Sequence, residues 1–125
     1  MMITRQFYPL VLVGYHLGLA MTVCIVGCFS SKVLGITDAR TRGAGIFALL
    51  TIIEATAMYP MVAFVNNHVS IRNEGLNFLL THTILVAVLL MVGCVLALQV
   101  RRYKAQLMMI NLLSVPFALV AWLSG

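Results

Sequence analysis

The chain has 125 residues, of which 62% are hydrophobic and 9% are charged, and its mean hydropathy is +1.07. An ordinary water-soluble domain has about 25% charged residues, so this composition excludes that class and indicates an integral membrane protein. The length allows one helical bundle. The net charge of +5 comes from basic residues at the ends of apolar runs, so it does not indicate nucleic-acid binding.

The first apolar run predicts a membrane-spanning helix over about residues 8–30. It is longer than the apolar region of a signal peptide and lacks a small-residue cleavage site after it, so we expect it to be retained. Gly14, Gly18 and Thr22 recur at four-residue spacing and predict a groove along which another helix packs closely. His16 lies on the same predicted helix.

A second span is predicted over about residues 45–66, and Glu54 near its middle is the one acid inside an apolar run. A carboxylate at the bilayer centre costs on the order of 2.5–3.5 kcal/mol, so such residues are candidates for function. Thr51 and Met58 share its helical face, and the hydroxyl of Thr51 could bond the carboxyl group. Pro60 predicts a kink nearby. The structural alternative is a neutral Glu54 that hydrogen-bonds a neighbouring helix.

Two further spans are predicted over about residues 78–99 and 105–123. The third carries His82 near its start, and the fourth carries Asn111, whose polar side favours contact with protein rather than lipid. Trp122 ends the fourth span, where an interfacial anchor is expected.

The expected fold is therefore an all-α bundle of four transmembrane helices. Basic residues concentrate on its first and third connections, whereas the opposite side has only Arg5 and Arg72. The positive-inside rule then predicts both termini on the non-cytoplasmic side. The residues on the two basic connections are Lys32, Arg40, Arg42, Arg101, Arg102 and Lys104.

This topology sorts the remaining polar residues by depth. His16, His82 and His68 fall near the outer face, and Glu54 lies between them and an inner layer of cysteines. Two histidines at matched depth could ligate haem b, or copper or zinc with Met58 as a soft neighbour. Interfacial or hydrogen-bonded histidines are the structural alternative. The cysteines are Cys24, Cys28 and Cys94, expected to act as small apolar residues.

The segment from Glu54 to Tyr59, EATAMY, resembles the outer helix of the proteolipid c subunit of rotary ATP synthases. In that family an acid followed by alanine and an aromatic residue carries the translocated proton. The resemblance covers about one helix and implies that Glu54 binds a proton.

The whole-chain layout is similar to the SirB family of small four-helix bacterial membrane proteins. Gly14-Tyr15-His16-Leu17 matches its Gly-x-His pattern, Lys32 falls near its basic residue, and the basic turn from Arg101 to Lys104 also fits. The Pro-His and Asp-Thr pair that opens the second helix in that family is absent here. The resemblance implies an inner-membrane protein with a regulatory role.

Three functions are carried forward from the sequence. The favoured one is a non-enzymatic subunit of a membrane complex or homo-oligomer, in which Glu54, with Thr51, Met58 and Asn111, binds a proton, a cation or a partner's charge. The second is a haem- or metal-binding redox subunit. The third is a purely structural assembly protein.

Overall fold

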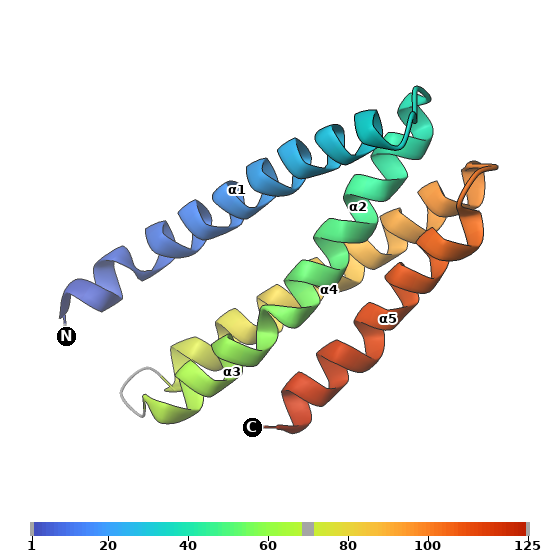
Figure 1. Cartoon of the computed structure of the whole chain (residues 1–125). Helices are drawn as coiled ribbons and strands as arrows, with labels where there is room; N and C mark the ends of the chain where they lie inside the picture. The colour runs from blue at the N-terminus through green and yellow to red at the C-terminus, as the bar shows by residue number, and fades with distance from the viewer. Residues whose placement is uncertain (1, 69–71, 125) are drawn as a thin grey trace.

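The computed structural model describes residues 2–68 and 72–124, and every regular element among them is helical (Figure 1). Four stretches are long and apolar enough to cross a membrane, and one of them is divided between two helices. The prediction of a four-span helical bundle is confirmed in this form, whereas the orientation of the termini stays a prediction. The helices are α1 (Met2–Val33), α2 (Ala39–Thr56), α3 (Met58–Asn67), α4 (Arg72–Gln99) and α5 (Lys104–Leu123).

The helices extend beyond the predicted spans because polar residues prolong them at the ends. α1 begins at Met2 rather than near residue 8, α2 begins at Ala39 rather than near 45, and α4 begins at Arg72 rather than near 78. Asp38 explains the early start of α2, since its carboxylate accepts the backbone N–H of Arg40 at 3.2 Å as an N-cap. The longer α1 places His16 near the middle of its helix rather than near its start.

The second span breaks between α2 and α3 at Ala57. A proline ring clashes with the carbonyl four residues earlier, and for Pro60 that residue is Thr56, the last of α2. Pro60 itself lies in the first turn of α3, where its missing N–H costs no helical bond. The predicted kink is therefore present as a break directly after Thr56.

α2 lies at the centre of the bundle and packs against α1, α4 and α5 (Figure 1). Its buried face is a stripe of small residues, which lets the neighbouring backbones approach closely. The stripe consists of Thr41, Ala44, Ala48, Thr51 and Ala55.

Two apolar clusters hold the bundle together at its opposite ends. One lies near the two basic connections and contains Ala44, Ala48, Ala97, Val100 and Leu107. The other joins α3 to α4 through Val62, Val65 and Leu79, with Met61 and Trp122 packed against it. Glu54, described next, lies between Ala48 of the first cluster and Val62 of the second in sequence.

α1 is the least embedded helix. Its backbone packs against α2 alone among the described helices, and Met21, Ile25 and Phe29 are all exposed. A Cβ atom added at Gly14 or Gly18 would meet nothing within 4 Å, and Thr22 is exposed. The predicted small-residue groove is therefore open within one chain, and its use by a further helix stays a prediction.

Candidate functional site

Three helices bring one acidic and two imidazole side chains together inside the bundle. Glu54 lies in the last turn of α2 and is 2% exposed, and His82 of α4 is 1% exposed. His16 of α1 completes the group with 24% of its side chain exposed. Nitrogen and oxygen atoms of all three residues lie within 4.8 Å of one another, and we call them the His–Glu–His cluster.

Glu54 contacts His16 directly. Oε1 of the carboxyl group lies 3.0 Å from Nδ1 of the imidazole, a hydrogen-bonding distance. Either Nδ1–H donates to a carboxylate, or a protonated carboxyl donates to the Nδ1 lone pair. In either case one hydrogen lies between the two atoms, bonded either to Nδ1 of His16 or to Oε1 of Glu54.

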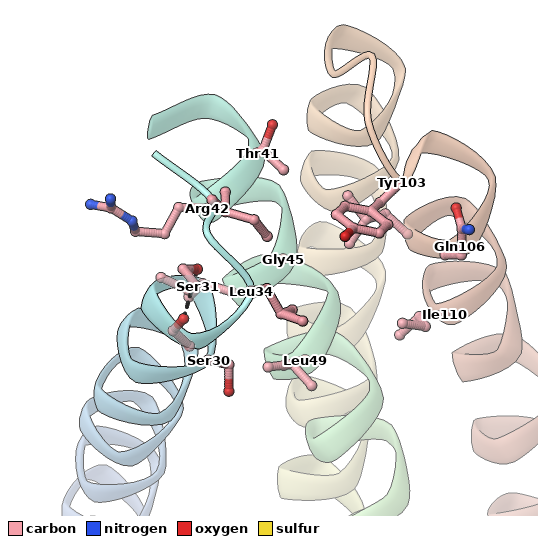
Figure 2. Close-up of a pocket in the computed structure, with 14 residues that line it drawn as sticks. Ser30, Ser31, Leu34, Thr41, Arg42, Gly45, Leu49, Tyr103, Gln106 and Ile110 are labelled. Atoms are coloured by element: carbon pink, nitrogen blue, oxygen red, sulfur yellow. Dashed lines mark hydrogen bonds between the residues drawn. The ribbon is translucent and has the colours of Figure 1, made fainter. Parts of the chain in front are cut away.

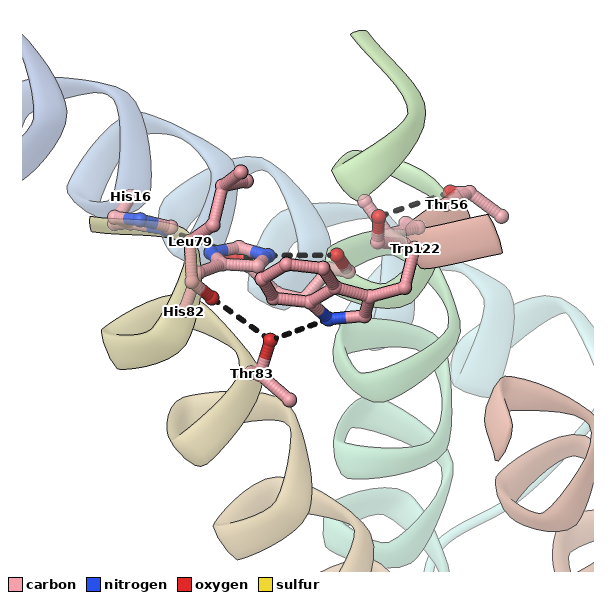
Figure 3. Close-up of polar contacts among 8 residues, drawn as sticks. His16, Thr56, Leu79, His82, Thr83 and Trp122 are labelled. Carbon is pink, nitrogen blue, oxygen red and sulfur yellow. Dashed lines mark hydrogen bonds and ion pairs between the residues drawn. The ribbon is translucent and has the colours of Figure 1, made fainter. Parts of the chain in front are cut away.

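The tautomer of His82 is determined by its partner. Its Nε2 lies 2.8 Å from the backbone carbonyl oxygen of Glu54, and a carbonyl oxygen accepts only, so Nε2 carries a hydrogen (Figure 3). The same nitrogen lies 3.3 Å from Oε2 of Glu54, close enough for electrostatic attraction, although Oε2 accepts no hydrogen bond. His82 thus fixes the α2 backbone at Glu54 and faces its carboxyl group.

The two imidazole rings stack on each other, with centroids 5.2 Å apart and an interplanar angle of 25° (Figure 3). Phe78 lies beside both, its centroid 6.4 Å from that of His16 and 6.3 Å from that of His82. Tyr15 meets the ring of His16 edge-on at 5.3 Å. The rings of Phe78 and Tyr15 therefore flank the two imidazoles of the cluster.

Two buried polar atoms of the cluster lack a hydrogen-bond partner, namely Oε2 of Glu54 and Nδ1 of His82. With Nε2 protonated, Nδ1 offers a lone pair, so both atoms are open acceptors. Buried acceptors of this kind are uncommon in native proteins and call for an explanation such as an exchanging proton or a bound ion.

Two of the other residues predicted for the Glu54 site, Thr51 and Asn111, hydrogen-bond within their own helices. Thr51 is buried and donates its hydroxyl to the carbonyl of Phe47 at 2.7 Å, not to the carboxyl of Glu54. Met58 is buried at the start of α3. Asn111 is buried on α5, where its amide donates to the carbonyl of Leu107 at 3.0 Å.

His68 is separate from the cluster. It caps the C-terminal end of α3, where its Nδ1 lies 2.7 Å from the carbonyl of Phe64 and its ring stacks on the Phe64 ring at 4.1 Å. Its side chain is exposed. His68 therefore lies apart from His16 and His82, which both contact Glu54.

A polar contact that the sequence did not predict joins α5 to α4 next to the cluster. Nε1–H of Trp122 donates to the hydroxyl of Thr83 at 2.9 Å, and that hydroxyl donates to the carbonyl of Leu79 at 2.7 Å (Figure 3). Thr83 follows His82 directly in α4, so this contact ties α5 to the turn that carries His82. Trp122 thus serves in helix packing, and pairing it with Thr83 would have required knowing which helices are neighbours.

The haem and metal alternatives can be tested against this geometry. Haem ligation by two histidines places the iron between the rings, and the ring centroids of His16 and His82 lie 5.2 Å apart, so these rings would have to separate to hold haem b, and haem binding stays a prediction. A copper or zinc ion would have to use Nδ1 of His82, because Nε2 carries the hydrogen donated to the Glu54 carbonyl, and metal binding by the cluster stays a prediction. A divalent ion would also leave a net positive charge in an apolar bundle, because the cluster contains one carboxylate.

No family model, curated protein or solved structure matches the chain.

Proposed function

We propose that this chain is a small multi-pass membrane protein that takes up and releases a proton at the His–Glu–His cluster, as a non-enzymatic subunit of a larger membrane complex or homo-oligomer. The main support for this proposal is the 3.0 Å contact between Nδ1 of His16 and Oε1 of Glu54 inside an apolar bundle. This proposal brings together the acid and the histidines that the sequence assigned to separate hypotheses.

Charge supports a proton as the ligand. One carboxylate balances one positive charge, and that balance is the same whether the shared proton is on Glu54 or on His16. Moving it between them therefore creates no net charge in the hydrocarbon region, where an unbalanced charge is expensive. His16 is the partly exposed member, so exchange with the surroundings passes through its ring, while His82 positions Glu54.

The test is a pH titration of the reconstituted protein by infrared difference spectroscopy, which detects the carboxyl group in its neutral and ionised forms. We expect the carboxyl bands that change with pH in the wild type to include one, beyond those of Asp38 and Glu74, that is lost in Glu54→Gln. Glutamine keeps the shape and the hydrogen-bonding capacity but does not ionise. His16→Gln should keep the band and move the pH at which it changes, because the partner of the shared proton has been removed.

His68→Gln is the matched control, since His68 is a histidine outside the cluster, and its titration should equal that of the wild type. If Glu54→Gln gave the same titration as the wild type, the proton-binding proposal would be wrong and the purely structural alternative would stand. Stoichiometric copper or zinc that is lost in His16→Gln and His82→Gln would favour a metal site instead.

A further inference from the structure

Two adjoining cavities lie at the end of the bundle that carries both basic connections. One is an apolar groove of about 230 Å³ between α1, α2 and α5 (Figure 2). The other is a polar cavity of about 450 Å³ between the α1–α2 loop and the α4–α5 loop. Ile36 and Thr41 line both, so the two cavities meet at the start of α2.

The apolar groove opens toward the side of the bundle, where lipid chains lie in a bilayer. α1 and α5 do not pack against each other, and the groove occupies the space between them over α2. Leu49, Ile110 and Tyr103 line its length (Figure 2). Sites for compact drug-sized ligands begin at about 300 Å³, so a groove of 230 Å³ suits a single hydrocarbon chain better.

The polar cavity is strongly basic. Arg40, Arg101 and Arg102 line it together with Thr37, Thr41 and Gln99. No guanidinium group of these three makes a salt bridge or a hydrogen bond among the described residues, although that of Arg102 lies 4.8 Å from the centroid of the Tyr103 ring. Asp38 also lines the cavity, but its carboxylate already accepts from Thr41 and from the N–H of Arg40. Three positive charges therefore face one committed negative charge.

The residue at the junction has an unusual backbone. Tyr103 has φ of 64° and is the one non-glycine residue with positive φ in the described chain. This left-handed conformation is unfavourable for a residue with a Cβ atom, and such residues concentrate at functional sites. It turns the chain so that the Tyr103 ring lines the groove while the adjacent Arg102 lines the polar cavity.

We propose that these cavities bind one anionic phospholipid, with its phosphate group among Arg40, Arg101 and Arg102 and one acyl chain in the groove. Guanidinium groups match phosphate oxygens in charge and geometry. Because an apolar groove adjoins the basic cavity, the site suits a lipid better than a free phosphate ion. This site is independent of the His–Glu–His cluster.

The test is a lipid titration of the detergent-purified protein by native mass spectrometry, with phosphatidylglycerol and phosphatidylcholine as probes. We expect one tightly retained phosphatidylglycerol and weaker retention of phosphatidylcholine. Each arginine near an anionic lipid contributes about fivefold in affinity, so replacing all three with glutamine should weaken phosphatidylglycerol binding about a hundredfold. Lys32→Gln is the matched control, because Lys32 is a basic residue near the same end that lines neither cavity, and it should bind as the wild type does.

A second pair of variants tests the groove. Gly43 and Gly45 both lie in α2 with nothing within 4 Å of an added Cβ, so a side chain can be introduced at either position, but of the two only Gly45 lines the groove. Gly45→Leu should weaken retention of phosphatidylglycerol, whereas Gly43→Leu should not. Equal retention of both lipids, or equal effects of the two leucines, would overturn the proposal. Inorganic phosphate that displaces the lipid at equal concentration would show a free-anion site instead.

Discussion

The buried polar residues of this bundle differ in where they find their partners. Asn111 and Ser114 on α5 are fully buried, and both bond within their own helix: Asn111 donates to Leu107, and Ser114 donates to the carbonyl of Asn111 at 2.5 Å. Glu54 instead bonds to side chains from two other helices. Oδ1 of Asn111 also lacks a partner among the described residues, so the difference is that the bonds of Glu54 join three helices and make their arrangement part of its chemistry.

The largest expected effect tests the bonds that Glu54 makes between helices. His82→Leu removes the donor to the Glu54 carbonyl and the positive edge facing its carboxyl group. Removing one partner from a buried pair costs about 3–5 kcal/mol, and we expect the low end because Glu54 can take up a proton. The free energy of unfolding in mixed micelles measures this loss. His68→Leu should change the free energy of unfolding little. An equal loss in His68→Leu would show that the bonds of His82 to Glu54 are not the cause.

A second variant tests the packing of Asn111. Gly93 of α4 has no side chain, which leaves room for the Asn111 amide. A Cβ at Gly93 would overlap Oδ1 of Asn111 and lie 3.0 Å from its Cγ. We therefore expect Gly93→Ala to destabilise the protein by about 1–3 kcal/mol through overpacking. Adding Asn111→Ala should recover part of that loss in the same unfolding measurement. Independent, additive losses would show that the two residues do not meet.

A smaller effect is expected at the contact behind the cluster. Thr83→Val removes the acceptor for the indole N–H of Trp122 and should cost about 1 kcal/mol, the usual net value of one hydrogen bond. In the double variant Thr83→Val with Trp122→Phe, neither partner remains unsatisfied, so part of this cost should return. Trp122 is the single tryptophan, so its emission reports the change directly in Thr83→Val. An unchanged emission spectrum would argue against the contact.

The smallest effect concerns Asp38, which caps α2 far from the cluster. The hydroxyl of Thr41 and the backbone N–H of Arg40 lower the pKa of its carboxyl group below the usual value. A depressed pKa means that the cap contributes stability above the ordinary pKa of about 3.9, and that this contribution is lost as the pH falls through the lower folded value. Acidification should therefore weaken the first turn of α2, as seen by amide hydrogen exchange. Asp38→Asn should remove this pH dependence, since asparagine caps without ionising.

The sequence was sufficient to predict four spans, because runs of about 20 apolar residues are a strong signal. It also singled out Glu54, His16 and His82, but it put Glu54 in a different layer from the histidines. The 3.0 Å contact between His16 and Glu54 depends on how α1 packs against α2, which neither apolar run reveals by itself. Contacts between helices depend on register and rotation, which composition does not encode.

The small-residue pattern shows the same limit. Gly14 and Gly18 predicted a contact groove on α1, yet the closely packed small residues of the monomer are on α2, including Ala44 and Ala48. α1 is apolar on most of its surface, so its pattern does not distinguish a lipid-facing side from a protein-facing one. The break at Ala57 was easier to anticipate, since the effect of Pro60 is local.

The isolation of α1 has a consequence for biogenesis. α1 is the first of these helices to be synthesised, and among the described residues its backbone packs only against α2, which follows it out of the ribosome. Until then it must reside in lipid alone, with an imidazole whose acidic partner has not yet been inserted. An incompletely assembled chain therefore exposes a polar group within the bilayer, a feature by which membrane chaperones and proteases can distinguish it from the finished protein.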